Sequence, residues 1–157
     1  MAFFSALLLF SANASAAGKA TAVQAFGLDS LGKIQSARLG KPFLLTFWSQ
    51  DCAHCPGELK TLGVLKKRYP QLDIVLVATD AADTAALAAE TARAYGLSGA
   101  EQWIFADDSP ERIRYAVDRK WYGELPRTLL YDRKHQVEGI SGLVPAARLQ
   151  RWVSETR

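Results

Sequence analysis

The chain has 157 residues, of which 49% are hydrophobic, and it carries a formal net charge of +3. This length and composition suit one domain with a substantial core, and two cysteines are too few for a disulfide-rich scaffold. The lysines and arginines are scattered, and their one run of three, at 66–68, is expected on the solvated face of a helix. The sequence therefore gives no sign of nucleic-acid binding.

The first 17 residues have the pattern of a secretion signal. An apolar run over 2–10 is followed by small residues, and Ala14-Ser15-Ala16 matches the A-x-A cleavage pattern. The run is too short to span a bilayer comfortably, and no lysine or arginine precedes it. We expect a cleaved signal over 1–17, a single domain over 18–157, and a periplasmic or otherwise exported protein. An uncleaved membrane anchor and a buried N-terminal helix are the alternatives.

The next elements begin with a weakly patterned stretch. Residues 18–40 are punctuated by four glycines and predict an entry strand and turns. A continuous apolar run over 42–48 is typical of a strand buried on both faces, and 73–79 has the same character. Between them, apolar residues at steps of three and four predict a helix from Cys55 to Tyr69, which Pro70 stops.

The second half of the chain continues the alternation of helices and strands. An alanine-rich helix is expected over 83–95, a short strand over 102–106, and a helix from Pro110 to about Lys120. Two strands, 127–131 and 136–141, are close enough to form a hairpin, and Pro145 opens a last helix. Strands alternating with helices predict an α/β domain, and the closing hairpin makes its sheet mixed.

The strongest chemical signal is the pair Cys52 and Cys55, which lies between a buried strand and a helix. At a helix N-terminus, unpaired N–H groups and the helix dipole favour an anion, so the Cys52 thiolate should be stabilised. Two intervening residues allow the sulfurs to join as a disulfide. Cys55 lies further in and should resolve the mixed disulfide that Cys52 forms. The pattern predicts a redox-active disulfide that needs no other cofactor.

The two histidines raise the questions of redox tuning and metal binding. His54, beside the thiolate, adds a donor and, when protonated, a positive charge, which would stabilise the reduced pair and make it more oxidising. A histidine exposed at the loop tip without effect is the alternative. A structural zinc site usually needs two more Cys or His ligands, and the chain offers only His54 and the distant His135. No metal site is expected.

The pattern W-x-x-x-C-x-x-C at Trp48, Cys52 and Cys55 resembles the thioredoxin superfamily. The resemblance implies a cis-proline before the penultimate strand, facing the disulfide, and Pro126 after Leu125 occupies that place; an ordinary trans bond is the alternative. The additional helix and strand between 73–79 and Pro126 resemble the TlpA-like and ResA-like exported oxidoreductases. These include thioredoxins of cytochrome c maturation.

That subfamily often carries C-x-x-C-x-x-E, and Glu58 stands at the last position. The resemblance implies that Glu58 lies close to Cys55 and helps to move its proton; a solvated helix glutamate is the alternative. The chain also departs from the family, because Thr46 occupies the place of a buried aspartate found in many thioredoxins. Ala53-His54 differs from the Gly-Pro common in reductases, which leaves the direction of electron flow open.

The resemblance implies an enzyme, a protein-disulfide oxidoreductase that reduces, or oxidises, disulfides in exported proteins such as cytochrome or metalloprotein maturation substrates. Pro126 and Leu125 would align the substrate chain, and Trp48 would pack under the motif and shield it. The expected partners are protein thiols or disulfides and a membrane or exported redox partner. A copper-binding, metallochaperone-like module that uses both cysteines and His135 is one alternative. An interaction domain with an inert disulfide is another.

Overall fold

The computed structural model describes residues 22–106 and 109–156, so the expected signal at 1–17 lies outside the described residues. One six-stranded sheet organises the described chain, with strands in the order β1-β4-β3-β2-β5-β6. The first four in this order are parallel, whereas β5 runs antiparallel to β2 and β6 antiparallel to β5. The strands are β1 (Gln24–Phe26), β2 (Phe43–Trp48), β3 (Ile74–Ala78), β4 (Glu101–Phe105), β5 (Arg127–Tyr131) and β6 (Val137–Ser141).

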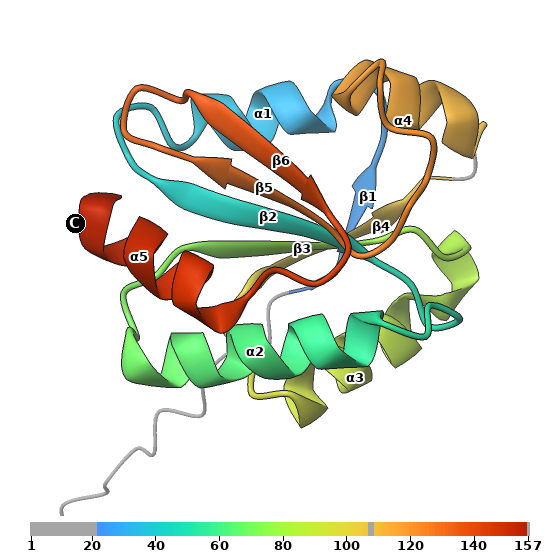
Figure 1. The fold of residues 1–157 in the computed structure, drawn as a ribbon. Coiled ribbons are helices and arrows are strands. Elements are labelled where there is room, and N and C mark those ends of the chain that lie inside the picture. The colour runs from blue at the N-terminus through green and yellow to red at the C-terminus, as the bar shows by residue number, and fades with distance from the viewer. Residues whose placement is uncertain (1–21, 107–108, 157) are drawn as a thin grey trace, which may run out of the picture.

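Helices cover both faces of this sheet. They are α1 (Ser30–Ser36), α2 (Cys55–Arg68), α3 (Ala85–Ala94) with the 3₁₀ turn η1 (Ala82–Thr84) before it, α4 (Pro110–Val117) and α5 (Ala146–Thr156). Helices α2, α3 and α5 lie on one face, and α1 and α4 lie on the other (Figure 1). Two hydrophobic cores result, one on each side of the sheet.

The central strands bury both of their faces, which explains their continuous apolar sequence. All six residues of β2 and all five of β3 are buried. Because side chains alternate along a strand, Leu44 and Trp48 join the core under α2, whereas Phe43 and Phe47 join the core under α1 and α4. The position between Leu44 and Trp48 on the α2 side is taken by a polar residue, Thr46, which is fully buried.

The expected α/β architecture is confirmed, including the mixed sheet and the closing hairpin of β5 and β6. The additional segment before the cis-proline strand is also present, since α3, β4 and α4 all lie between β3 and β5. Strand β4 inserts between β3 and β1, so it extends the sheet at the edge far from the hairpin.

Two boundaries differ from those that the sequence predicts. The stretch 18–40 is predicted to hold a strand and turns, but it also contains the helix α1. This helix has seven residues with a glycine among them and buries only Ser30 and Ile34, so its periodic signal is too short to detect. Helix α4 ends at Val117, three residues before the expected end, because Asp118 adopts an extended conformation.

Within the described residues, no helix combines the length and apolar character needed to cross a membrane.

Candidate active site

The cysteine pair lies where β2 gives way to α2. The two residues form a disulfide, with their Cα atoms 5.4 Å apart. Helix α2 begins at Cys55, with His54 at its N-cap position and a proline in the first turn. A proline costs no hydrogen bond there, because the first N–H groups of a helix have no partner within it. The disulfide is therefore fixed at the end of the sheet where β2 finishes, between this strand and the start of α2.

The two sulfurs have different surroundings. Cys52 is partly exposed, whereas Cys55 is 0% exposed and belongs to the core under α2. The Cys55 amide donates to the Cys52 sulfur at 3.1 Å. An N–H at a helix N-terminus that already points at a sulfur will stabilise that sulfur as a thiolate after reduction. Cys52 is therefore the sulfur suited to attack, and Cys55 the one suited to resolution.

Asp80 holds the segment that carries Cys52. It follows β3, the parallel neighbour of β2, so its carboxylate lies at the same end of the sheet. The Ser49 hydroxyl donates to Oδ1 of Asp80 at 2.8 Å, and the Gln50 amide donates to its two oxygens at 3.1 and 3.2 Å. These bonds give hydrogen-bond partners to the polar groups of the turn between Trp48 and Cys52, and they restrict the movement of this turn.

Glu58 lies one helical turn after Cys55 and is fully buried, at 0% exposure, which rules out a solvated helix glutamate. Its Oε2 accepts the Val144 amide at 3.0 Å, and its Oε1 accepts the Thr128 hydroxyl at 3.2 Å. Burial raises the pKa of Glu58 above its usual value, and the two hydrogen bonds offset part of that rise. A buried carboxyl of this kind is suited to exchange a proton with a neighbouring thiol.

Pro126 follows a cis peptide bond after Leu125, as the resemblance implies. In the antiparallel pairing, Phe47 lies opposite Arg127, so Pro126 comes one step beyond this pair, across from Trp48 at the end of β2. Leu125 is half-buried and packs against the core that contains Cys55. The strand register therefore brings Leu125 and Pro126, the proline loop, to the end of β2, where the segment that carries Cys52 begins.

A third segment, over 142–145, completes this end of the sheet. The Gly142 amide donates to the carbonyl of Pro126 at 2.8 Å, and the next residues run over the first turns of α2. The side chain of Leu143 lies over Gly57, where an added Cβ would be 3.3 Å from its Cδ2, and it remains half-exposed. The segment thus links the proline loop to Glu58, through the amide of Val144, and presents an apolar side chain beside the motif.

Trp48 and the two histidines have the following places. Trp48 is 2% exposed and belongs to the same core as Cys55, so it can act by packing under the motif. His54 is exposed, and its effect on the cysteines stays a prediction. His135 packs against Phe43, with ring centroids 5.6 Å apart, and its Nε2 contacts the Arg38 carbonyl at 2.8 Å.

His135 is therefore separated from the cysteines by the length of β2. Phe43 begins that strand and Trp48 ends it, and at about 3.3 Å per residue the two ends are roughly 17 Å apart. His135 does not complete a copper site with Cys52 and Cys55. Among the described residues, no group of three or more His, Cys, Asp or Glu side chains is arranged to hold a metal ion.

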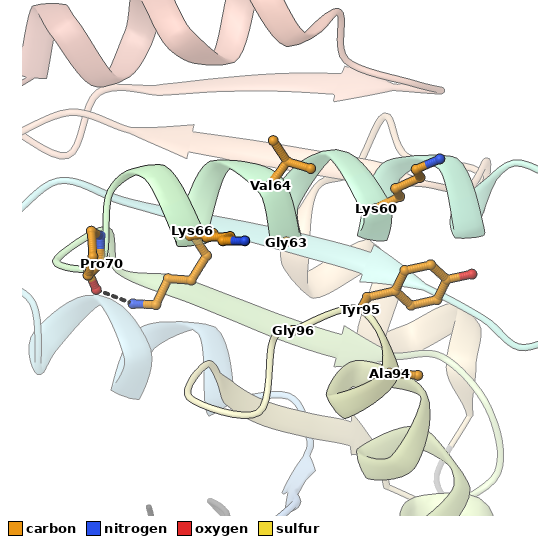
Figure 2. Close-up of a pocket in the computed structure, with 9 residues that line it drawn as sticks. Lys60, Gly63, Val64, Lys66, Pro70, Ala94, Tyr95 and Gly96 are labelled. Atoms are coloured by element: carbon orange, nitrogen blue, oxygen red, sulfur yellow. Dashed lines mark hydrogen bonds between the residues drawn. The ribbon is translucent and has the colours of Figure 1, made fainter.

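A groove of about 800 Å³ lies elsewhere, between α2 and the end of α3 (Figure 2). It is lined by Lys60, Gly63, Val64, Lys66, Lys67, Pro70, Ala94, Tyr95 and Gly96. The Lys66 ammonium group on its margin donates to the carbonyls of Pro70 and Leu72. Neither the cysteines nor Glu58 line this groove, so it is separate from the candidate active site.

Three residues that contribute to the site were not predicted from the sequence. Asp80 follows a buried parallel strand, a position where functional side chains collect, so that signal was available. Thr128 stands two residues after Pro126, but its contact with Glu58 depends on strand pairing. Val144 contributes through its backbone amide, and no side-chain pattern marks such a donor.

Neither a protein-family model nor a curated protein matches the sequence. Solved structures do resemble it, among them a thioredoxin-family thiol:disulfide interchange protein from Chlorobium tepidum. That structure has a TM-score of 0.61 and 18% identity, and the match covers 78% of this chain and 83% of that one. A secreted disulfide oxidoreductase from Mycobacterium tuberculosis, described as homologous to DsbE of E. coli, has a TM-score of 0.59 and 20% identity. That match covers 76% of this chain and 85% of the other.

A third structure, StoA from Bacillus subtilis, gives a TM-score of 0.52 and 16% identity, covering 73% of this chain and 84% of that one. The sequence identities are low, so these matches bear on the fold. The chain has a thioredoxin-like fold, as the Trp48, Cys52 and Cys55 pattern implies.

Proposed function

We propose that this chain is an exported thiol-disulfide oxidoreductase that reduces disulfides in other exported proteins. One observation carries the proposal: a partly exposed Cys52 is bonded to a buried Cys55 at the first turn of α2, one turn before the buried Glu58. An inert structural disulfide needs neither an exposed attacking sulfur nor a buried carboxyl one turn away. The similarity to structures of disulfide oxidoreductases supports the same conclusion.

The reaction begins with the reduced pair. The Cys52 thiolate attacks one sulfur of a substrate disulfide, which breaks the substrate S–S bond and releases its other sulfur as a thiolate that takes up a proton. Cys55 then gives its proton to the Glu58 carboxylate and attacks Cys52. This second attack forms the Cys52–Cys55 disulfide and breaks the bond between Cys52 and the substrate, whose second sulfur leaves as a thiolate and takes up a proton. The substrate gains two electrons and the cysteine pair loses them.

Each turnover leaves the pair oxidised, so an exported or membrane-bound dithiol partner has to return two electrons. The substrate chain would lie along the proline loop, where Leu125 and Pro126 reach the same end of the sheet as the cysteine segment. Proteins whose cysteines must be thiols before they bind haem or a metal are the substrate class that we propose. The reverse reaction would make the same chain a disulfide donor.

Variants of the two cysteines test the activity. With dithiothreitol as the electron source, the wild type is expected to reduce the disulfides of insulin, and Cys52→Ser to lose this activity. Cys55→Ser should accumulate a mixed disulfide through Cys52, because the resolving thiol is missing. Nonreducing electrophoresis and mass spectrometry identify this species. Insulin reduction by Cys52→Ser that is faster than reduction by dithiothreitol alone would contradict the proposal.

The reduction potential decides the direction. Equilibration of the wild type in glutathione buffers, followed by thiol trapping, gives its value. A potential near that of thioredoxin, about −270 mV, supports a reductase. A potential near that of DsbA, about −120 mV, would indicate a disulfide donor and overturn the reductive assignment. The exposed His54, which adds positive charge when protonated, is the residue whose replacement by alanine is expected to lower the potential.

A further inference from the structure

Glu58 has an unusual set of partners for a buried acid. The carboxyl group is fully enclosed and receives two hydrogen bonds, from the Val144 amide and from the Thr128 hydroxyl. Within the described residues, no lysine, arginine or histidine forms an ion pair with it. The two donors therefore take the place that water has around an exposed carboxylate.

Apart from Cys55, which lies one turn earlier on the same helix, the neighbouring elements of the described chain direct no titratable side chain at Glu58. On β5, Arg127 and Tyr131 alternate with Thr128 and therefore point to the opposite face of the sheet. Strand β2 and the segment 142–145 carry no ionisable side chain. The ionisation of Glu58 thus depends on its burial, on its two donors and on whether Cys55 is a thiol, a thiolate or part of the disulfide.

The two donors differ in what they can do. The Val144 amide can only donate, whereas a threonine hydroxyl can donate one hydrogen bond and accept others. The Thr128 oxygen lies 3.0 Å from the Thr46 hydroxyl oxygen, and both threonines are 0% exposed. They are direct cross-strand neighbours on β5 and β2, which fixes their distance. Thr128 therefore stands between Glu58 and a second hydroxyl that can itself donate or accept.

Each protonation state of Glu58 fits one direction of this hydroxyl chain. When the carboxyl is ionised, Thr128 donates to Oε1 and accepts from Thr46. When Oε1 carries a proton, it can donate to Thr128, which turns and donates to Thr46. Rotation of the two hydroxyl groups thus follows the movement of one proton, without any change in the backbone or in the packing of the core.

We propose that Thr128 is a positioning residue for proton transfer at Cys55, which keeps Glu58 able both to take up and to release a proton. Thr46 is the supporting residue that completes the hydrogen bonds of Thr128 in either direction. This inference rests on the proposed function, because it concerns the proton that Cys55 must lose before it resolves the mixed disulfide. It goes beyond that function in assigning a role to two threonines of the sheet.

The first test measures Glu58 directly in the oxidised protein, where the cysteines do not titrate. Thr128→Val removes a donor to the charged form, so the pKa of Glu58 should rise by about 1 or more. Thr128→Ser keeps the hydroxyl and should restore the wild-type pKa to within a few tenths. Thr46→Val is the matched control, since it removes a hydroxyl equally buried but one bond further away. Its effect should be less than half that of Thr128→Val.

Titration of the Glu58 side-chain carboxyl by carbon-13 NMR gives these values. A pKa in Thr128→Val within a few tenths of the wild type would overturn the proposal. So would a pKa in Thr128→Ser raised as far as in Thr128→Val, because the serine preserves the donor. The serine variant also separates the lost hydroxyl from any damage to folding, which the unfolding transition of each variant monitors.

The second test uses the pH profile of disulfide exchange. If Thr128 acts through Glu58, the pH dependence of the resolving step should move to higher pH in Thr128→Val, by as much as the pKa of Glu58 moves. A uniform loss of rate at every pH would indicate a structural role and contradict the proposal. A wild type that exchanges no disulfide at any pH would refute the proposed function itself. Normal exchange with an unmoved profile in Thr128→Val would refute only the role of Thr128.

Discussion

Among single residues, Glu58 shows a conflict between burial and charge, because its ionisable carboxyl group is fully buried. Burial raises its pKa, while the Val144 amide and the Thr128 hydroxyl lower it again in part. The folded protein therefore holds the Glu58 proton at a pH where the unfolded chain has lost it. In that window, from the usual value of about 4.5 up to the raised value, the free energy of unfolding must fall as the pH rises. Above the raised value the loss is complete and constant.

Glu58→Gln removes this dependence. A glutamine can accept from Val144 through its carbonyl and donate to Thr128 through its amide, so the packing should survive. We expect the oxidised variant to show a flatter pH dependence than the wild type and a larger free energy of unfolding above the window. A pKa raised by 1 corresponds to a difference of about 1.4 kcal/mol. Urea unfolding of both proteins as a function of pH measures the difference.

Glu90→Gln is the control for this comparison. Glu90 lies exposed on α3, where it pairs with Arg93, so its replacement removes a surface carboxyl group and leaves the buried one in place. Curves for Glu58→Gln and the wild type that ran parallel through the acid range would mean that Glu58 titrates normally. The proposed proton transfer at Cys55 would then lose its basis.

At the scale of elements, the close packing of α2 against the end of α3 depends on one glycine. An added Cβ at Gly63 would lie 1.9 Å from the carbonyl oxygen of Tyr95, which belongs to the backbone and cannot rotate away. Gly63→Ala should therefore separate the two helices and lower the free energy of unfolding. The loss should exceed the gain of about 0.5–1 kcal/mol that alanine brings to a helix interior.

Gly57→Ala, on the same helix, is the matched control. Its added Cβ would lie 3.3 Å from the side chain of Leu143, which is half-exposed and free to shift. The helix-propensity gain should therefore survive there, and this variant should be as stable as the wild type or slightly more stable. Urea unfolding of the two variants decides the matter. Equal stability of Gly63→Ala and Gly57→Ala would show that the close approach at Tyr95 is not rigid.

A helix or strand could be predicted where the local pattern of apolar residues reflects how the element is buried. The run 42–48 is apolar throughout because β2 is covered on both faces, and the periodicity after Cys55 reflects the single buried side of α2. Helix α1 carries no such signal, because its seven residues make only about two turns and bury only Ser30 and Ile34. The cysteine motif and the cis-proline were visible as residue types.

The groups to which we assign a part in proton transfer were only partly predictable from the sequence. Glu58 stood at a recognisable spacing from Cys55, but its burial could not be inferred from a helix that also carries lysines. The pairing of Thr46 with Thr128 joins residues 82 positions apart and exists only through the register of β2 and β5. Register follows from packing of the whole sheet, and no single segment encodes it.

At the scale of the whole molecule, the cysteine pair and an ion cluster around the buried Arg38 lie at opposite ends of the strands. Arg38, just after α1, contacts Asp73 before β3 and Glu101 at the start of β4, at 2.8 and 2.7 Å. Burial alone would lower the pKa of Arg38, but the two carboxylates outweigh it and raise that pKa. The cysteines follow the other end of β2, which runs parallel to β3. The cluster therefore ties α1 to the sheet without touching the redox site.

Arg38→Met should separate stability from chemistry. It leaves Asp73 and Glu101 without their cation, and the free energy of unfolding should fall by about 2–4 kcal/mol. This loss is smaller than for a fully enclosed ion pair, because both acids are partly exposed to water. The reduction potential should stay unchanged, since the cysteine segment is anchored by Asp80 at the opposite end of the strands. Arg93→Met, which removes an exposed ion pair, should cost less than about 1 kcal/mol. A changed potential in Arg38→Met, measured while the protein is fully folded, would mean that the sheet transmits strain along its strands, because no direct contact connects the two sites.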